Sequence, residues 1–168
     1  MAFDENKGIL HMPIDTLVHA DSVSTSFPRI SPDGHFLMYT ETAYGQFPIW
    51  HKDAEIRMID LKTGSQMDMS AVNSQDTESY HSWSSNSRWV VISSRRDNGL
   101  YTLPYIAYID EQGKPSKPFL LPQKYPDFYD YLLYSYNIPE LARGKIQTNP
   151  YQIQHVSTKG QAEQIKFK

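Results

Sequence analysis

The sequence contains no cysteine, so disulfide bonds, thiolate catalysis and thiolate-bound metals are all excluded. It also has no apolar run close to the ~20 residues that a membrane-spanning helix needs. No block of basic residues is longer than two, and the formal net charge is −3. Because nucleic-acid binding depends on concentrated positive charge, we expect no nucleic-acid partner.

The N-terminal residues MAFDENKGIL lack both the basic start and the apolar segment of a signal peptide. Two interpretations stay open at this point. Either the protein works in the cytoplasm, or the chain is part of a longer polypeptide whose leader lies outside it.

What the sequence does contain is an aromatic-rich composition that favours β structure. Aromatic residues make up 13% of the 168 residues, with 12 Tyr, and there are 11 Pro. Tyr, Trp and β-branched side chains suit the pleated, half-buried surface of a sheet. The length suits one domain or a piece of a larger protein.

A repeat of about fifty residues organises the chain. The stretch RISPDGHFLMYT, residues 29–40, matches SWSSNSRWVVIS, residues 82–93. A loop of different length then leads in each copy to a strand that ends in Asp and a Gly turn, IRMIDLKTG and YIAYIDEQG. Loops tolerate length changes better than strands, so this is how a structural repeat diverges. The matched pairs are Ser31 and Ser84, Asp33 and Asn86, Phe36 and Trp89, Asp60 and Asp110, and Gly64 and Gly113.

Each repeat unit reads as four short antiparallel strands joined by turns. Pro presets φ in the SPDG turn, and Gly supplies the positive φ that tight turns need. Asp side chains bond to backbone amides in such turns. The residues expected to act structurally in turns are Asp33, Gly34, Asp60, Gly64, Asn86, Asp110 and Gly113.

Repeated four-stranded units of this length are typical of β-propeller blades. Residues 20–122 resemble the TolB-like, WD-type β-propeller repeats of bacterial envelope proteins. The resemblance is based on the SPDG turn at residues 31–34, on Trp83 and on the turn residues just named. The fold class we expect is all-β: a partial β-propeller of about two four-stranded antiparallel blades plus part of a third. The expected divisions are the end of a preceding blade (1–20), a first blade (21–73), a second blade (74–123) and an aromatic C-terminal extension (124–168).

The resemblance implies an interaction scaffold in the periplasm or outer envelope. Propellers close with about 4–8 blades, so the chain is expected to be the C-terminal part of a longer protein. The open sheets would be covered by the remainder of the propeller, by a second copy in a homodimer through the blade edges, or by the aromatic extension. In that extension we expect a short helix near residues 127–134 and a strand at YQIQHV, residues 151–156.

Two polar and aromatic stretches are candidates for partner binding. The loop AYGQFPIWHKDA places Tyr44, Phe47 and Trp50 in a connection, where aromatics act as anchors of a binding surface or pack against a neighbouring blade. Arg95 and Arg96 follow a strand in SSRRDNG, where one is expected to form an ion pair between blades and the other to face a partner. Ordinary solvated loop charge is the alternative for both arginines.

Catalysis is the weaker interpretation. The six histidines show no zinc-ligand spacing, and no G-x-S-x-G elbow occurs, so neither a metal nor a cofactor is expected. The function we expect is non-catalytic binding or scaffolding within a larger envelope propeller. The alternatives are a propeller lyase or hydrolase with His81, Arg95 or Asp residues near the central channel, and a regulatory or lid domain attached to a peptidase.

Overall fold

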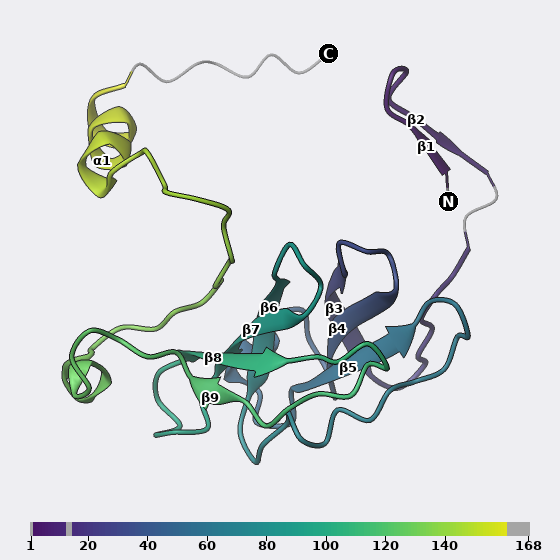
Figure 1. Cartoon of the computed structure of the whole chain (residues 1–168), viewed down its shortest axis with the longest axis horizontal. Helices are drawn as coiled ribbons and strands as arrows, with labels where there is room; N and C mark the ends of the chain where they lie inside the picture. The colour runs from purple at the N-terminus through teal and green to yellow at the C-terminus, as the bar shows by residue number, and fades with distance from the viewer. Residues whose placement is uncertain (1, 13–14, 161–168) are drawn as a thin grey trace.

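A computed structural model describes residues 2–12 and 15–160 and belongs to the all-β class. Residues 24–120 form two antiparallel sheets and their connections, shown in Figure 1. The first sheet contains β3 (Ser24–Ile30), β4 (Phe36–Thr42) and β5 (Glu55–Asp60). The second sheet contains β6 (Glu78–Trp83), β7 (Trp89–Ser94), β8 (Leu103–Tyr108) and β9 (Phe119–Leu120). Within each sheet the strands follow chain order.

The two sheets pack face to face and bury the main core between them. Every second residue of β4 and β7 points into this interface, as expected for the two-residue period of a strand. The ring of Phe36 stacks on that of Trp83 with centroids 6.5 Å apart. The buried core side chains are Phe36, Met38, Ile56, Met58, Met69 and Val72 from the first repeat unit and Trp83, Val90, Ile92 and Ile109 from the second.

The inner turn of each unit has the same hydrogen bonds. In the first, the Ser31 hydroxyl donates to Asp33 Oδ1 (2.6 Å) and accepts from the amide of Phe36 (2.9 Å). In the second, the Ser84 hydroxyl donates to Asn86 Oδ1 (2.5 Å) and accepts from the amide of Trp89 (2.9 Å).

The position of positive φ also recurs in these turns. Gly34 has a φ of 72° and Ser87, its counterpart, 59°. The turns therefore have the structural role expected of Asp33, Gly34 and Asn86.

The outer turns also repeat their hydrogen bonds, but their register differs. Asp60 Oδ1 accepts from the amide of Lys62 (2.7 Å), and Asp110 Oδ1 accepts from the amide of Gln112 (3.0 Å). The ladders, however, pair Phe36 with Asp60 and Trp89 with Tyr108. The second turn thus lies two residues further from its strand than the sequence alignment implies. Gly64 and Gly113 both have positive φ, 72° and 80°.

The first sheet has three strands, whereas four were expected. The segment after β5 makes an isolated bridge between Ile59 and Gln66 and then leaves the sheet. At the same edge, the side chain of Asn73 pairs with the backbone of Ile56: its Oδ1 accepts from the Ile56 amide (2.9 Å) and its Nδ2 donates to the Ile56 carbonyl (3.1 Å). An amide side chain therefore satisfies backbone groups that a fourth strand would have paired.

Both ends of the described chain lie apart from the sheets in Figure 1. At the N-terminal end, β1 (Ala2–Asp4) and β2 (Ile9–His11) form a hairpin. At the C-terminal end, α1 (Pro150–Lys159) begins with a capping box between Asn149 and Gln152. The strand expected at residues 151–156 is therefore wrong, because this segment is helical.

The helix expected near residues 127–134 is shorter than predicted. It is the 3-10 helix η2 (Phe128–Tyr131). Leu132, directly after this helix, is buried against Leu103 and Tyr105. Leu133 is exposed.

Among the described residues no helix has the length and hydropathy to cross a bilayer.

Candidate binding surface

The aromatic loop at residues 43–53 connects β4 to β5 and is closed at its base by Asp53. The carboxylate Oδ2 of Asp53 accepts a hydrogen bond from the Ala43 amide (2.6 Å) and one from the Thr42 hydroxyl (3.1 Å). The bond from Ala43, above all, lowers the pKa of Asp53. An ionised Asp53 thus holds the two ends of the loop together at neutral pH.

Three aromatic side chains project from this closed loop into solvent. Tyr44, Phe47 and Trp50 are 69%, 69% and 68% exposed. Tyr44 packs on the ring of His51 at 4.5 Å, and η1 (Pro48–Trp50) orders the centre of the loop. The sequence places these aromatics in one connection and leaves open binding or packing against a neighbouring blade. They do lie in one loop, and each side chain is mostly exposed. The large exposed apolar area marks this loop as a candidate interaction site.

Arg95, from the second repeat unit, joins the loop of the first. Its guanidinium lies 4.9 Å from the centroid of the Trp50 ring. The side chain is largely buried, its Nη2 donates to the carbonyl of Gly99, and its Nε has no hydrogen-bond partner among the described residues. A cation over an indole face is stabilised by the ring quadrupole. The structure therefore brings together two of the sequence-predicted site residues from different units.

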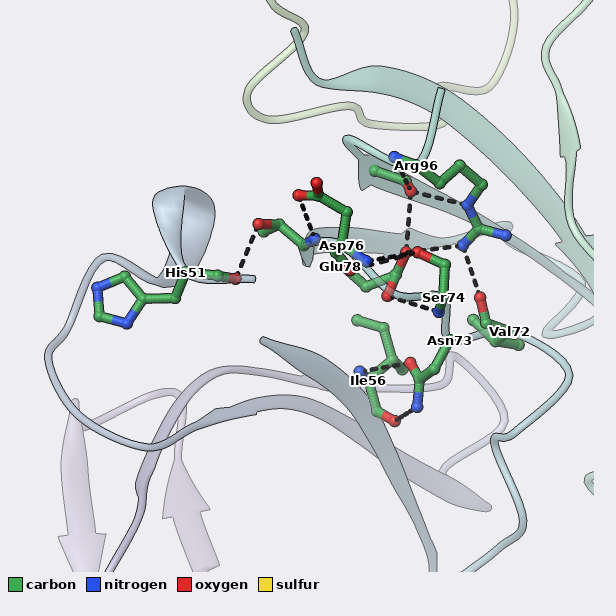
Figure 2. Close-up of polar contacts among 10 residues, drawn as sticks. His51, Ile56, Val72, Asn73, Ser74, Asp76, Glu78 and Arg96 are labelled. Atoms are coloured by element: carbon green, nitrogen blue, oxygen red, sulfur yellow. Dashed lines mark hydrogen bonds and ion pairs between the residues drawn. The ribbon is translucent and has the colours of Figure 1, made fainter. Parts of the chain in front are cut away.

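Two hydrogen bonds from β6 and the residue before it also attach the C-terminal end of this loop to the second sheet. The hydroxyl of Thr77, directly before β6, donates to the carbonyl of His51 (2.8 Å). Figure 2 shows this bond at the labelled His51. The amide of Glu78 donates to the carbonyl of Ala54 (2.9 Å). Because these bonds anchor the loop at its C-terminal end, the aromatics are displayed on a fixed platform. We call Tyr44, Phe47, Trp50 and Arg95 the aromatic platform.

Arg96 points away from the platform into the protein. Its Nη2 lies 2.9 Å from Glu78 Oε1 and 2.6 Å from the carbonyl of Val72, and its Nε donates to the Ser94 hydroxyl (2.8 Å), as drawn in Figure 2. The guanidinium also lies 4.7 Å from the ring centroid of Tyr105. Arg96 thus ties the loop after β5 to the second sheet, and the alternative of an ordinary solvated charge does not describe it.

Glu78 is the partner that sequence reasoning missed. Its side chain has no exposed surface, and burial raises its pKa, although hydrogen bonds from Ser74 and Ser94 and the charge of Arg96 act in the opposite direction. The Ser74 hydroxyl and amide donate to the two carboxylate oxygens at 2.7 and 3.0 Å. Glu78 begins β6, next to a shift in its register with β7. In the sequence, an acidic residue at the start of a short strand is read as facing solvent, so its burial could not be predicted.

His81, the histidine considered for a channel site, lies between the two sheets. Its Nδ1 is 3.2 Å from the carbonyl of Ser79 and its Nε2 is 3.2 Å from the carbonyl of Met38. Burial lowers the pKa of His81 to about 4. A neutral, buried imidazole bonded to backbone is a packing element, and Arg95 lies elsewhere, on Trp50. The described residues contain no group of three or more carboxylates and histidines placed to hold a metal.

No protein-family model, no curated protein and no solved structure matches this chain. The function is therefore inferred from the geometry just described. That geometry offers a fixed aromatic surface next to a buried ion-pair network.

Proposed function

We propose that the chain is a non-catalytic binding and scaffolding module of a larger β-propeller protein of the bacterial envelope. It recognises a protein partner through the loops at the ends of its sheets. The observation that carries this proposal is the aromatic platform, in which Arg95 lies over Trp50 in the loop that also exposes Tyr44 and Phe47. Trp, Tyr and Arg are the residues most enriched in the energetic centres of protein interfaces.

Several features support a rigid recognition surface. The loop is closed by Asp53 and fastened to β6, so little conformational entropy is lost when a partner binds. Repeated, stacked antiparallel sheets agree with the propeller-type resemblance of the sequence, and the envelope location is part of the same proposal. The partner is a protein with an apolar or aromatic patch that packs on the exposed rings of the platform, while the buried Arg95 supports the Trp50 ring from within.

The test places a photo-crosslinking amino acid at Phe47 of the protein in its native cells. Leu133, which is equally solvent-facing but far along the chain, is the matched control position. We expect one discrete adduct from Phe47 and none from Leu133. The proposal is wrong if the two positions give the same products.

A second arm measures affinity for the partner identified in this way. Trp50→Ala is expected to raise the dissociation constant at least about thirtyfold, the effect of removing a central interface residue. Leu133→Ala should leave it unchanged. An unchanged constant in the Trp50 variant, with the fold intact by near-ultraviolet circular dichroism, contradicts recognition through the platform.

A further inference from the structure

The second sheet has a face that corresponds to the buried face of the first. Phe36 and Trp89 follow the same turn at the same position, and both point in the same direction along the stack. Phe36 is 1% exposed because the second sheet covers it, whereas Trp89 is 36% exposed. The face of β7 that carries Trp89 thus repeats a surface that, in the first sheet, packs against another sheet.

The C-terminal extension covers only part of that face. In the first interface the Thr40 hydroxyl donates to the carbonyl of Ser79 in β6 (2.7 Å). At the corresponding position Ser93 donates to the carbonyls of Tyr136 (2.7 Å) and Asn137 (2.9 Å). The extension thus takes the place of one strand. Beside it a groove of about 420 Å³ remains, lined by Trp89, Ile106, Phe119, Leu121 and Leu141 among others.

The opposite end of the stack carries the complementary surface. Ile30 pairs with Leu37 in the first sheet as Trp83 pairs with Val90 in the second. Ile30 therefore corresponds to Trp83, the residue that stacks on Phe36, yet Ile30 is 55% exposed. It borders a groove of about 450 Å³ together with Leu17, Pro28, Leu37 and Tyr39.

We propose that copies of this chain associate head to tail through these two grooves. Ile30 of one copy packs on Trp89 of the next, in the way that Trp83 packs on Phe36 within one chain. The occupant is a second copy because the two end surfaces are the two halves of an interface that the chain already forms internally. The inference concerns surfaces other than the aromatic platform. It rests on the proposed propeller in one respect: the neighbouring blades that cover these two surfaces are supplied by further copies of this chain.

Such an interface does not close at two copies. It joins different patches, so every dimer still offers one free surface of each kind. Association continues until a ring closes or a filament grows. Edge-to-edge pairing in a symmetric homodimer, by contrast, uses the same patch twice and stops at the dimer.

The experiment measures mass by sedimentation velocity over a wide range of concentration. We expect the wild-type mass to increase beyond that of a dimer. Ile30→Lys and Trp89→Lys should each reduce the association constant at least about thirtyfold, because each places a charge at the centre of the contact. Leu100→Lys changes an exposed apolar residue that lines neither groove and should behave as wild type.

Mixing the two variants is the decisive arm. The Ile30→Lys copy keeps an intact Trp89 surface, and the Trp89→Lys copy keeps an intact Ile30 surface. An equimolar mixture should therefore form a 1:1 dimer and nothing larger. If Trp89→Lys does not fold, Phe119→Lys, at an exposed position in the same groove, replaces it.

Three results overturn the proposal. The first is a wild-type protein that stays monomeric up to millimolar concentration. The second is a wild-type dimer that does not grow further, which indicates symmetric pairing. The third is folded variants that associate as strongly as wild type or do not combine on mixing.

Discussion

Arg96 Nη2 lies 2.9 Å from Glu78 Oε1, and the two side chains differ in their access to water: Glu78 has none, whereas the Arg96 side chain is 16% exposed. Removal of the arginine leaves a carboxylate without its cation in a dry site. Removal of the carboxylate leaves a cation that still reaches solvent. The two single substitutions are therefore not equivalent.

Arg96→Met should lower the free energy of unfolding by about 3 kcal/mol or more, the usual cost of leaving a buried charge unpaired. Glu78→Gln should cost less, because its Oε1 still accepts from the hydroxyls of Ser74 and Ser94, although its NH2 group replaces the oxygen that accepts from the Ser74 amide. In the double variant the loss should be smaller than the sum. Urea unfolding of the four proteins gives the coupling free energy, and additive losses would show that the pair does not act as a unit.

The neutral state of His81 predicts a specific loss of stability in acid. Its folded pKa of about 4 lies below the ordinary value of 6.5, so the unfolded chain binds the proton first as pH falls. Stability from this residue is full above about pH 6.5 and decreases towards about pH 4, by on the order of 3 kcal/mol.

The matched variant is His81→Gln, which does not titrate in this range. The difference in unfolding free energy between wild type and variant should shrink as pH falls, because all other titrating groups are common to both. A difference that is independent of pH would mean that His81 binds its proton equally in the folded and the unfolded protein, so that folding does not lower its pKa.

Two glycines at corresponding turn positions should respond differently to alanine. Gly64 and Gly113 both have positive φ, which costs a residue with a Cβ about 1–2 kcal/mol. A Cβ at Gly64 would meet no atom of the described residues within 4 Å, whereas one at Gly113 would lie 2.8 Å from the ring of Phe36. Gly113→Ala should therefore cost about 1–3 kcal/mol more than Gly64→Ala. Equal losses in thermal or urea unfolding would contradict the close packing of this turn on the first sheet.

Asn73 should protect the edge of the first sheet through its side-chain amide. Asn73→Ala leaves the amide and the carbonyl of Ile56 without these partners and should cost about 2 kcal/mol. Asn73→Asp keeps the acceptor but places a carboxylate oxygen against the Ile56 carbonyl, so it should not restore stability. Hydrogen exchange at the Ile56 amide is the direct measurement, and unchanged protection in the alanine variant would mean that another group covers this edge.

The turns could be predicted from sequence because their hydrogen bonds are local. Ser31, Asp33 and Phe36 lie within six consecutive residues, so their side-chain chemistry determines the loop on its own. The same local match placed Asp60 and Asp110 in their turns, but it does not give the register of the strands. Phe36 pairs with Asp60 whereas Trp89 pairs with Tyr108, and no local pattern encodes this difference.

The expected fourth strand of the first sheet fails for a related reason. Residues 65–72 read as an outer strand by composition, whereas the edge of β5 is paired by the side chain of Asn73. A single amide replaces a strand only in a particular tertiary position. The helix at residues 150–159 was likewise read as a strand, because alternation in a short segment does not distinguish the two.

For the candidate site, the residue types could be predicted but not their partners. Trp50 and Arg95 were each proposed as binding residues, yet their contact joins segments from two different units. Glu78 escaped notice since an acidic residue in a short strand is read as exposed. The family resemblance, the envelope location and the binding role remain predictions.

The serine-centred turns also bear on how quickly the chain reaches its native state. Each closes a loop of a few residues, the kind of event that takes microseconds or less, whereas the bond from the Asp33 amide to the Ser87 hydroxyl spans 54 positions of the chain. The three-stranded and the four-stranded sheet can thus form early and independently, and the docking of one sheet on the other becomes the slow step. Substitutions in the turns should then affect the early hairpins, while those between the sheets should alter mainly the kinetics of docking and separation.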